Sequence, residues 1–151
     1  GELAVAGILA VPYVHWATKE QMKPGREPLG RYYQRMGTAA LALDAEFAAL
    51  HFQECLRWYP FPDCRMGWGQ WLLQQGRAEE AIPELEAAVS GYSQAPGDVM
   101  GALYLSLGQA YLTVGRTEEG LAHVREAAAR APPGSALRQE SEKLLNARGG
   151  P

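Results

Sequence analysis

Two stretches of sequence decide the fold: GQWLLQQGRAEEAIPELEAA at residues 69–88 and GQAYLTVGRTEEGLAHVREA at residues 108–127. A shift of 39 residues aligns them with eight identities in twenty positions, and the conservative pairs Ile82/Leu121 and Leu85/Val124 lie between the identities. Self-similarity at a fixed period is the signature of a repeat architecture. The sequence therefore predicts a structural unit that occurs at least twice.

Each unit is predicted to be two helices joined by a short turn. Gly76-Arg77 and Gly115-Arg116 stand where the first helix should close, because glycine adopts the left-handed conformation that a C-cap requires. The glutamate pairs that follow suit the positive end of a second helix. From Arg31 onward, no segment alternates polar and apolar residues for long enough to indicate a strand. We therefore expect an all-α fold.

The later unit resembles a tetratricopeptide repeat (TPR). It carries that family's alternation of bulky and small residues, ending in proline, at Tyr104, Leu107, Gly108, Tyr111, Gly115, Gly120, Val124, Ala127 and Pro132. The preceding unit is similar at Trp68, Gly69, Leu72, Gly76, Ala81, Leu85 and Ala88, with Ser93 in place of the closing proline. An earlier unit fits, with a turn one residue shorter, as Tyr33, Gly37, Ala40, Ala48, Phe52, Cys55 and Pro60. The resemblance covers about residues 31–132 and implies a right-handed α-α superhelix, a TPR-like solenoid.

The remaining segments complete the predicted domain organisation. The shift of 39 exceeds the family's usual repeat of about 34 residues, and we expect the extra residues within Val89–Asp98, as a longer second helix, a longer loop or both. Ser135–Arg148 predicts a C-terminal capping helix with a thin apolar stripe of Leu137, Leu144 and Leu145. The predicted organisation is an apolar N-terminal helix at 1–18, a connector at 19–30 and the TPR-like domain at 31–148.

Leu3–Thr18 is a run of sixteen residues without a carboxylate, lysine or arginine. A membrane-spanning helix needs about 20 apolar residues. The run therefore fits either a membrane anchor or a helix packed on the protein, with a targeting remnant as a third interpretation. The anchor would use the side chains of Leu3, Val5, Ile8, Leu9, Val11, Tyr13 and Trp16. Five basic residues follow within twenty positions, which would place the repeat domain on the cytoplasmic side of a membrane. A soluble cytoplasmic protein is the alternative.

The TPR resemblance implies a peptide-binding or protein-binding groove on the concave side, lined by the first helix of each unit. Carried over by position, the partner-binding residues are Gln34, Thr38, Met66, Gln70, Leu73, Gln74, Leu105, Gln109, Leu112 and Thr113. Some family members hold a peptide carboxylate with Lys, Arg and Asn, whereas this chain has Met66 and Gln70 at these positions. An apolar helix or an extended segment is therefore the expected partner. Alternatively, several of these residues pack between repeats, as periodic apolar positions often do.

The composition gives little support to chemistry or to nucleic-acid binding. The net charge is −3, from 14 basic and 17 acidic residues, whereas a nucleic-acid partner requires a concentrated basic face. His51, Cys55 and Cys64 lack a fourth ligand for a closed zinc site. The two cysteines are either buried thiols or a disulfide. No nucleophile–base set and no phosphate-binding glycine motif occurs. We expect no catalytic residue, cofactor, metal or small-molecule substrate.

Two interpretations of the aromatic cluster Trp58, Tyr59, Phe61, Trp68 and Trp71 stay open: an interface with a partner, or filling between repeats. The sequence as a whole favours a non-catalytic scaffold for protein–protein interaction, attached as an accessory or assembly subunit to a membrane complex if Leu3–Thr18 is an anchor. The alternatives are a small enzyme or ligand-binding protein on the same scaffold, or a self-assembling repeat protein. Arginine outnumbers lysine eleven to three, which points to a GC-rich bacterial genome.

Overall fold

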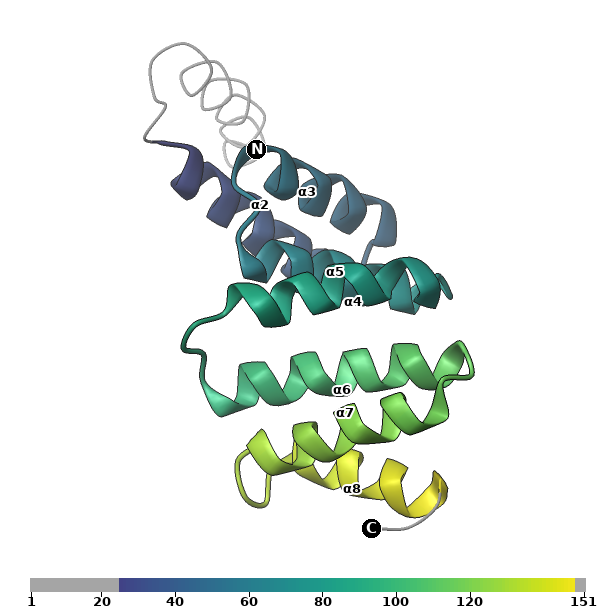
Figure 1. The fold of residues 1–151 in the computed structure, drawn as a ribbon. Coiled ribbons are helices and arrows are strands. Elements are labelled where there is room, and N and C mark those ends of the chain that lie inside the picture. The colour runs from purple at the N-terminus through teal and green to yellow at the C-terminus, as the bar shows by residue number, and fades with distance from the viewer. Residues whose placement is uncertain (1–24, 149–151) are drawn as a thin grey trace. The chain divides into compact units, whose positions relative to one another are not determined.

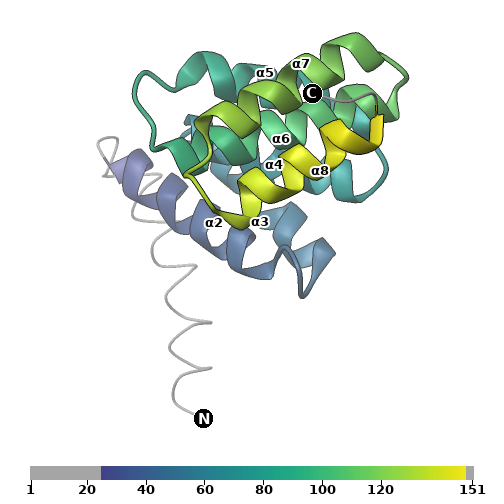
Figure 2. The ribbon, with the colours of Figure 1, turned by 90° about the horizontal axis from the view of Figure 1, so that it is seen from below.

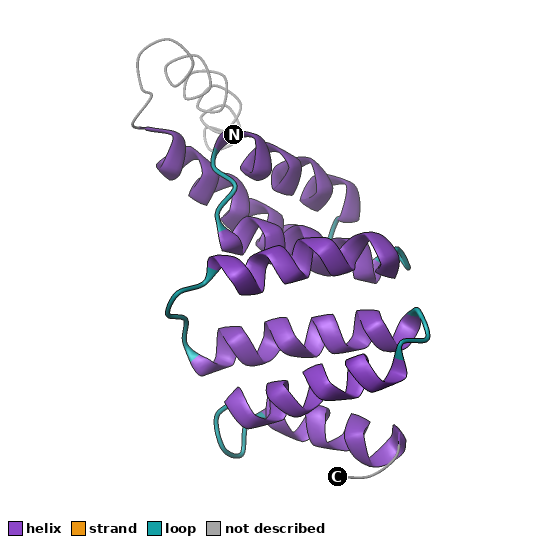
Figure 3. Ribbon diagram, viewed as in Figure 1, coloured by secondary structure: helices purple, strands orange, loops and turns teal. Residues whose placement is uncertain are grey.

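The computed structural model of the protein describes residues 25–148 as an all-α fold (Figures 1 and 3). This part of the chain contains seven helices and no strand. The chain divides into two compact units, residues 1–60 and 61–151. The first unit contains α2 (Arg26–Ala40) and α3 (Ala45–Trp58). The second contains α4 (Pro62–Gln74), α5 (Ala78–Gly91), α6 (Gly97–Thr113), α7 (Thr117–Arg130) and α8 (Ala136–Arg148). The expectation of an all-α fold is confirmed.

In the first unit, α2 and α3 pack as an antiparallel pair. A Cβ placed on Gly37 would lie 2.8 Å from Cε1 of Phe52, so the helices approach at a point where only glycine fits. Gly30, near the start of α2, faces Tyr59 at the end of α3 in the same way. The turn between the helices has no residue with positive φ. Instead, the side chain of Asp44 caps α3 by accepting a hydrogen bond from the backbone N–H of Phe47 at 3.1 Å.

α2 begins earlier than the sequence predicts, inside the expected connector at 19–30. Its first residue is Arg26, and Pro28 lies in its first turn. A proline is tolerated there because the first backbone N–H groups of a helix have no partner within the helix. Arg31 also donates to Glu27 one turn earlier, at 2.8 Å, which joins the first two turns.

In the second unit, the two turns related by the 39-residue shift have the same geometry. Gly76 and Gly115 have positive φ, 77° and 85°, and each follows the end of a first helix. The next backbone N–H, of Arg77 or Arg116, donates at 2.9 Å to a carbonyl five residues earlier. That bond and the left-handed glycine make a Schellman motif at both turns. Both arginines then pair with a glutamate three residues later, with N–O distances of 2.6 Å. The predicted repeated helix–turn–helix is present.

The crossing of the two helices in each unit also repeats. A Cβ on Gly69 would lie 2.7 Å from Leu85, and one on Gly108 would lie 2.6 Å from Val124. The sequence separation is 16 residues in both pairs, against 15 for Gly37 and Phe52. The prediction of a one-residue shorter first turn is wrong, because four residues separate α2 (Arg26–Ala40) from α3 (Ala45–Trp58), whereas three separate α4 from α5 and α6 from α7.

The extra residues of the long repeat do not lengthen the second helix. α5 and α7 both have 14 residues, whereas α6 has 17 and α4 has 13. The insertion within Val89–Asp98 thus extends the start of α6 and the loop before it. Gly97 allows the extended helix to lie against α7, because a Cβ there would be 2.5 Å from the carbonyl oxygen of Arg130.

The helices of the second unit form two layers. Each helix packs on the next along the chain, and α6 also contacts α4 and α8. α4, α6 and α8 therefore make one layer and α5 and α7 the other (Figure 2). One core cluster lies between α4, α5 and α6, and includes Leu72, Leu85, Leu103 and Leu107. Helix packing of this kind is consistent with a helical repeat.

α8 closes the second unit by covering α6 and α7. Leu145 joins Leu105, Leu112, Val124 and Ala127 in a buried cluster. Most of the other residues of α8 are exposed and polar, as expected for a helix on which no further helix of the described chain packs.

Candidate partner-binding surface

An uncharged row of side chains runs across α4 and α6. Gln70 reaches from α4 to α6, where its Nε2 donates to Oγ of Ser106 at 3.3 Å. Gln109 and Thr113 follow on the face of α6 one and two turns along, and the Thr113 hydroxyl donates to the carbonyl oxygen of Gln109 at 2.8 Å. Gln74 and Thr113 are exposed, and Gln70 and Gln109 are half-buried. We refer to Gln70, Gln74, Gln109 and Thr113 as the amide row.

The four aliphatic residues predicted for the same surface hold helices together. Leu105 and Leu112 are only 6% and 8% exposed, because they lie in the buried cluster that α6 and α7 form with Leu145 of α8. Met66 and Leu73 are half-buried against the cluster between α4, α5 and α6. The burial of Leu105 and Leu112 favours the alternative interpretation, in which these residues pack between helices. Leu105 and Leu112 lie on the side of α6 that would face the next first helix of the same layer. α8 occupies the place of that helix.

The remaining two predicted residues lie in the first unit. Gln34 donates from Nε2 to Oγ1 of Thr38 at 3.0 Å, one turn along α2. Gln34 is half-buried and Thr38 is exposed. Both belong to the other compact unit, and the name amide row is kept for the residues of the second unit.

A hollow of about 420 Å³ lies at the end of the amide row, where Thr113 meets the α4–α5 turn. It is lined by Gly76, Arg77, Ala78, Glu79, Glu80, Thr113 and Val114. Arg77 binds Glu80 through two hydrogen bonds, and this bond lowers the pKa of the Glu80 carboxyl. With two carboxylates and one guanidinium, the hollow is net acidic, which disfavours a partner's carboxylate. The sequence alone does not reveal this hollow, because its lining comes from residues 76–80 and 113–114, which are far apart in the sequence.

The shifted tyrosine and histidine pKa values of the second unit belong to packing contacts outside the amide row. The pKa of Tyr111 is raised to about 12, first by its hydrogen bond to Glu86 and then by burial. Burial, and next a hydrogen bond to Asp63, raise the pKa of Tyr92. Each shift follows from a bond or burial between neighbouring helices. Neither tyrosine belongs to the amide row.

His123 lies in a stack of rings between α6 and α7. Its ring is 5.1 Å from that of Tyr111 and 5.9 Å from that of Tyr104, measured between centroids, with interplanar angles of 16° and 22°. The guanidinium groups of Arg116 and Arg130 cover the outer faces of the two tyrosines. Burial lowers the pKa of His123, against the attraction of nearby carboxylates. The stack joins two helices and gives His123 no nucleophile to activate.

The cysteines do not supply metal ligands. Neither is a free thiol, and Cys55 and Cys64 are both disulfide-bonded. The suggested His51, Cys55 and Cys64 site therefore lacks its thiolates. Within residues 25–148, no three His, Cys, Asp or Glu side chains come together as a possible metal site. His51 instead stacks on Phe47 at a centroid distance of 3.9 Å.

The aromatic residues of α4 pack against the second unit's own core. The rings of Trp68 and Trp71 are stacked, with centroids 4.8 Å apart and an interplanar angle of 5°. Both are half-buried against the cluster between α4, α5 and α6. Arg77 covers the ring of Trp71 at 5.7 Å. These contacts favour the interpretation in which the tryptophans fill space between helices.

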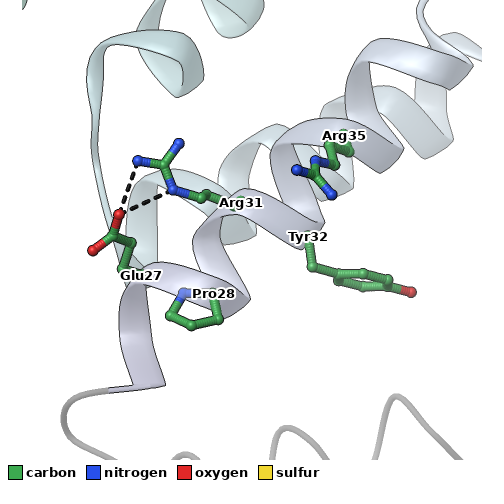
Figure 4. A pocket seen from close by; sticks show the side chains of 5 residues that line it. All are labelled: Glu27, Pro28, Arg31, Tyr32 and Arg35. Carbon is green, nitrogen blue, oxygen red and sulfur yellow. Dashed lines mark hydrogen bonds and ion pairs between the residues drawn. The ribbon is translucent and has the colours of Figure 1, made fainter.

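A second hollow, of about 490 Å³, lies along the first turns of α2. It is lined by Glu27, Pro28, Arg31, Tyr32 and Arg35 (Figure 4). Arg31 and Glu27 are held together by two bonds, at 2.8 and 3.0 Å, while Tyr32 projects away from them (Figure 4). All five residues come from one helix, so the hollow has a single wall among the described residues.

The predicted anchor, Leu3–Thr18, lies outside the described residues. Between residues 25 and 148, no helix combines the length and the apolar character needed to cross a bilayer.

Comparison with known sequences adds no further identification. Neither the protein-family models nor the curated proteins contain a match to this chain.

Proposed function

We propose that the protein is a non-catalytic scaffold that binds an extended segment of a partner protein along the amide row. The observation that carries the proposal is the uncharged row across two adjacent helices, bridged by Gln70 and Ser106 at 3.3 Å. Side-chain amides offer both a donor and an acceptor, which matches the alternating N–H and C=O groups of an extended peptide. Such a row holds a peptide backbone without requiring a particular side-chain charge.

The proposal includes a TPR-like domain with a right-handed superhelix. It is supported by the repeated Schellman turns at Gly76 and Gly115 and by the repeated close crossings at Gly69 and Gly108. It is also supported by the two-layer order, in which α4, α6 and α8 line one side. In such stacks the first helices form the concave binding side. Attachment to a membrane complex depends on Leu3–Thr18, outside the described residues, and is not part of this proposal.

The net acidic hollow beside Thr113 sets the direction of the bound segment. Its charged lining residues are Glu79, Glu80 and Arg77, of which Glu80 is bonded to Arg77. A positively charged end or a basic side chain of the partner is favoured at this end of the row, and a terminal carboxylate is disfavoured. This distinguishes the surface from a carboxylate-binding groove.

The test is a selection from a library of random dodecapeptides against the full chain. Selected peptides are then measured with the variant Gln74→Ala/Gln109→Ala, which keeps Gln70 and its bond to Ser106. We expect these peptides to bind this variant about tenfold or more weakly, as for the loss of one or two hydrogen bonds. The control Gln139→Ala, an exposed amide on α8, should bind them as the unchanged chain does.

Two results would contradict the proposal. One is a set of peptides that bind the row variant as tightly as the unchanged chain. The other is no enrichment of peptides together with a mass in light scattering that rises with protein concentration, which would favour the self-assembling alternative.

A further inference from the structure

Large apolar side chains are unevenly exposed in this molecule. Among residues 25–148, the exposed large hydrophobic side chains are Leu43, Leu50, Tyr32 and Phe47, with 87%, 61%, 39% and 37% of their surface exposed. All four belong to the first unit. The second unit has none within its described residues, although it is the larger of the two.

Three of these residues form one stripe. Phe47 and Leu50 are three residues apart on one face of α3, and Leu43 lies in the turn two residues before α3 begins. We call them the apolar stripe. An isolated exposed leucine needs no explanation, but a continuous apolar stripe marks a surface that another group covers.

Ring contacts extend the stripe from α3 onto α2. Phe47 stacks on His51 with centroids 3.9 Å apart, and His51 lies 5.7 Å from the ring of Tyr33. Tyr33 in turn meets Tyr32 edge to face at 5.4 Å. The contacting rings therefore run from Phe47 through the buried Tyr33 to the exposed Tyr32, which projects from α2 (Figure 4).

We propose that Leu3–Thr18 of the same chain docks on the apolar stripe. This inference is independent of the function proposed for the amide row. The segment has sixteen residues with no carboxylate, lysine or arginine, so it carries apolar surface of its own that water does not favour. Docking removes both apolar surfaces from water at once.

The linker between the segment and α2 is long enough for the segment to reach the apolar stripe. Seven residues, 19–25, separate Thr18 from the start of α2. Extended, they reach about 23–25 Å. α2, with 15 residues, is ~22 Å long. Since α3 runs back along α2, every residue of the stripe lies within about one helix length of Arg26, and the segment itself spans ~24 Å even if helical.

Connection in one chain favours this occupant over an external one. A short linker holds its two ends at an effective concentration in the millimolar range, far above that of any separate partner. The stripe is also flanked by the exposed carboxylates of Asp44 and Glu46. Next to the stripe these carboxylates repel an anionic lipid surface, whereas they do not repel an uncharged segment; the exposed Arg31 and Arg35 lie beside Tyr32 on α2.

The test is hydrogen exchange of the full chain, followed by mass spectrometry. In the unchanged protein, without lipid, we expect the amides of residues 3–18 to be protected. In Leu43→Ser/Phe47→Ser/Leu50→Ser, their protection should fall about tenfold or more, the scale of losing a local docking equilibrium. The control Ala39→Ser/Gln53→Ser changes exposed residues of the same two helices and should leave that protection unchanged.

A reciprocal experiment leaves α3 intact. Ile8→Asp/Leu9→Asp places charges in the segment, and hydroxyl-radical labelling of Phe47 and Leu50 should then rise several-fold. Free exchange of residues 3–18 in the unchanged chain would overturn the proposal, and so would protection that the stripe variant does not alter. Protection that appears only with phosphatidylglycerol–phosphatidylcholine vesicles would assign the segment to a membrane, and protection that grows with protein concentration would assign the stripe to a second copy. Either result also overturns it.

Discussion

The helix pair α2–α3 and the two helix pairs of α4–α7 share one way of packing and differ in how their turns are made. In all three, a glycine of the first helix faces a large side chain of the second so closely that a Cβ would lie within 2.8 Å of it. The turns of α4–α7 close on left-handed Gly76 and Gly115, whereas the turn of α2–α3 closes on the side chain of Asp44. The close crossing at a glycine is thus common to all three pairs, whereas the turn on a left-handed glycine is specific to α4–α5 and α6–α7.

The two regions also differ in what they leave exposed. Each of the helices α4–α7 is covered by the next, and α8 closes the series, so the large apolar residues of that unit are covered. The pair α2–α3 keeps the apolar stripe on its surface. Helix pairs that cross in the same way can therefore differ in how much apolar surface they leave exposed.

The largest effects are expected from the buried side chains at the crossings. Phe52 and Leu85 are both 0% exposed. Their replacement by alanine should cost about 3–5 and 2–5 kcal/mol of unfolding free energy, respectively, because each leaves a cavity. Hydrogen exchange should report the loss of Phe52 in α2 and α3 and the loss of Leu85 in α4–α7. If Phe52→Ala leaves exchange in α2 and α3 unchanged, the crossing at Gly37 does not hold that pair together.

The second prediction compares two glycines at equivalent crossings. A Cβ on Gly108 would lie 3.0 Å from the backbone oxygen of Gly120, which cannot move aside, whereas the corresponding oxygen of Ala81 is 3.5 Å from a Cβ on Gly69. Gly108→Ala should therefore destabilise the protein by about 1–3 kcal/mol, as overpacking does. Gly69→Ala should cost less, because the side chain of Leu85 can rotate away. Urea unfolding measures the loss of unfolding free energy in both variants. A larger loss for Gly69→Ala would show that α6 and α7 do not approach each other more closely than α4 and α5.

These differences also mark the limits of prediction from the sequence. The 39-residue shift was sufficient for the turns of α4–α5 and α6–α7, because glycine recurs at the one position where each turn needs a left-handed residue. It could not show that α8 buries Leu105 and Leu112, since that depends on where a helix with no repeat partner packs. It also left the longer start of α6 undecided, because Val89–Asp98 is polar and could belong to a loop or a helix. The amide row was predicted by position, while its bond to Ser106 depends on the distance between α4 and α6.

The third prediction separates the two kinds of turn. Gly115→Ala should cost about 1–2 kcal/mol, because its φ of 85° is a left-handed conformation that alanine disfavours. Asp44→Ala removes a helix cap instead and should cost about 1 kcal/mol. Thermal unfolding of the two variants measures both. Ala42→Gly, in the turn without positive φ, is the control and should not stabilise the protein. A gain in stability there would mean that this turn also favours a left-handed residue.

Within α4–α7, one pair of equivalent positions joins its two helices differently in the two repeats. Arg65 and Glu84 form an ion pair at 3.0 Å in the first, and the residues 39 positions later, Tyr104 and His123, are stacked rings. The same geometric site thus joins its two helices by charge in one repeat and by aromatic contact in the other. Only the second can respond to mild acid, because histidine alone among these four side chains has an ordinary pKa near 6.5.

The smallest effect is therefore expected from pH. Burial lowers the pKa of His123, although the carboxylates of Glu86 on α5 and of Glu119 and Glu126 on α7 raise it in part. The unfolded chain takes up the proton near pH 6.5 and the folded chain only at lower pH, so the contribution of His123 is present above pH 6.5 and is lost as the pH falls through that value. Urea unfolding between pH 7.5 and 5 should show this loss in the unchanged chain and a shallower one in His123→Gln. The double substitution Tyr104→Arg/His123→Glu replaces the stacked rings by the ion pair of the neighbouring repeat. It should also remove the contribution of His123 to the pH dependence of the unfolding free energy. If both variants lose as much unfolding free energy between pH 7.5 and 5 as the unchanged chain, the acid sensitivity comes from another group. The stack then does not oppose the protonation of His123.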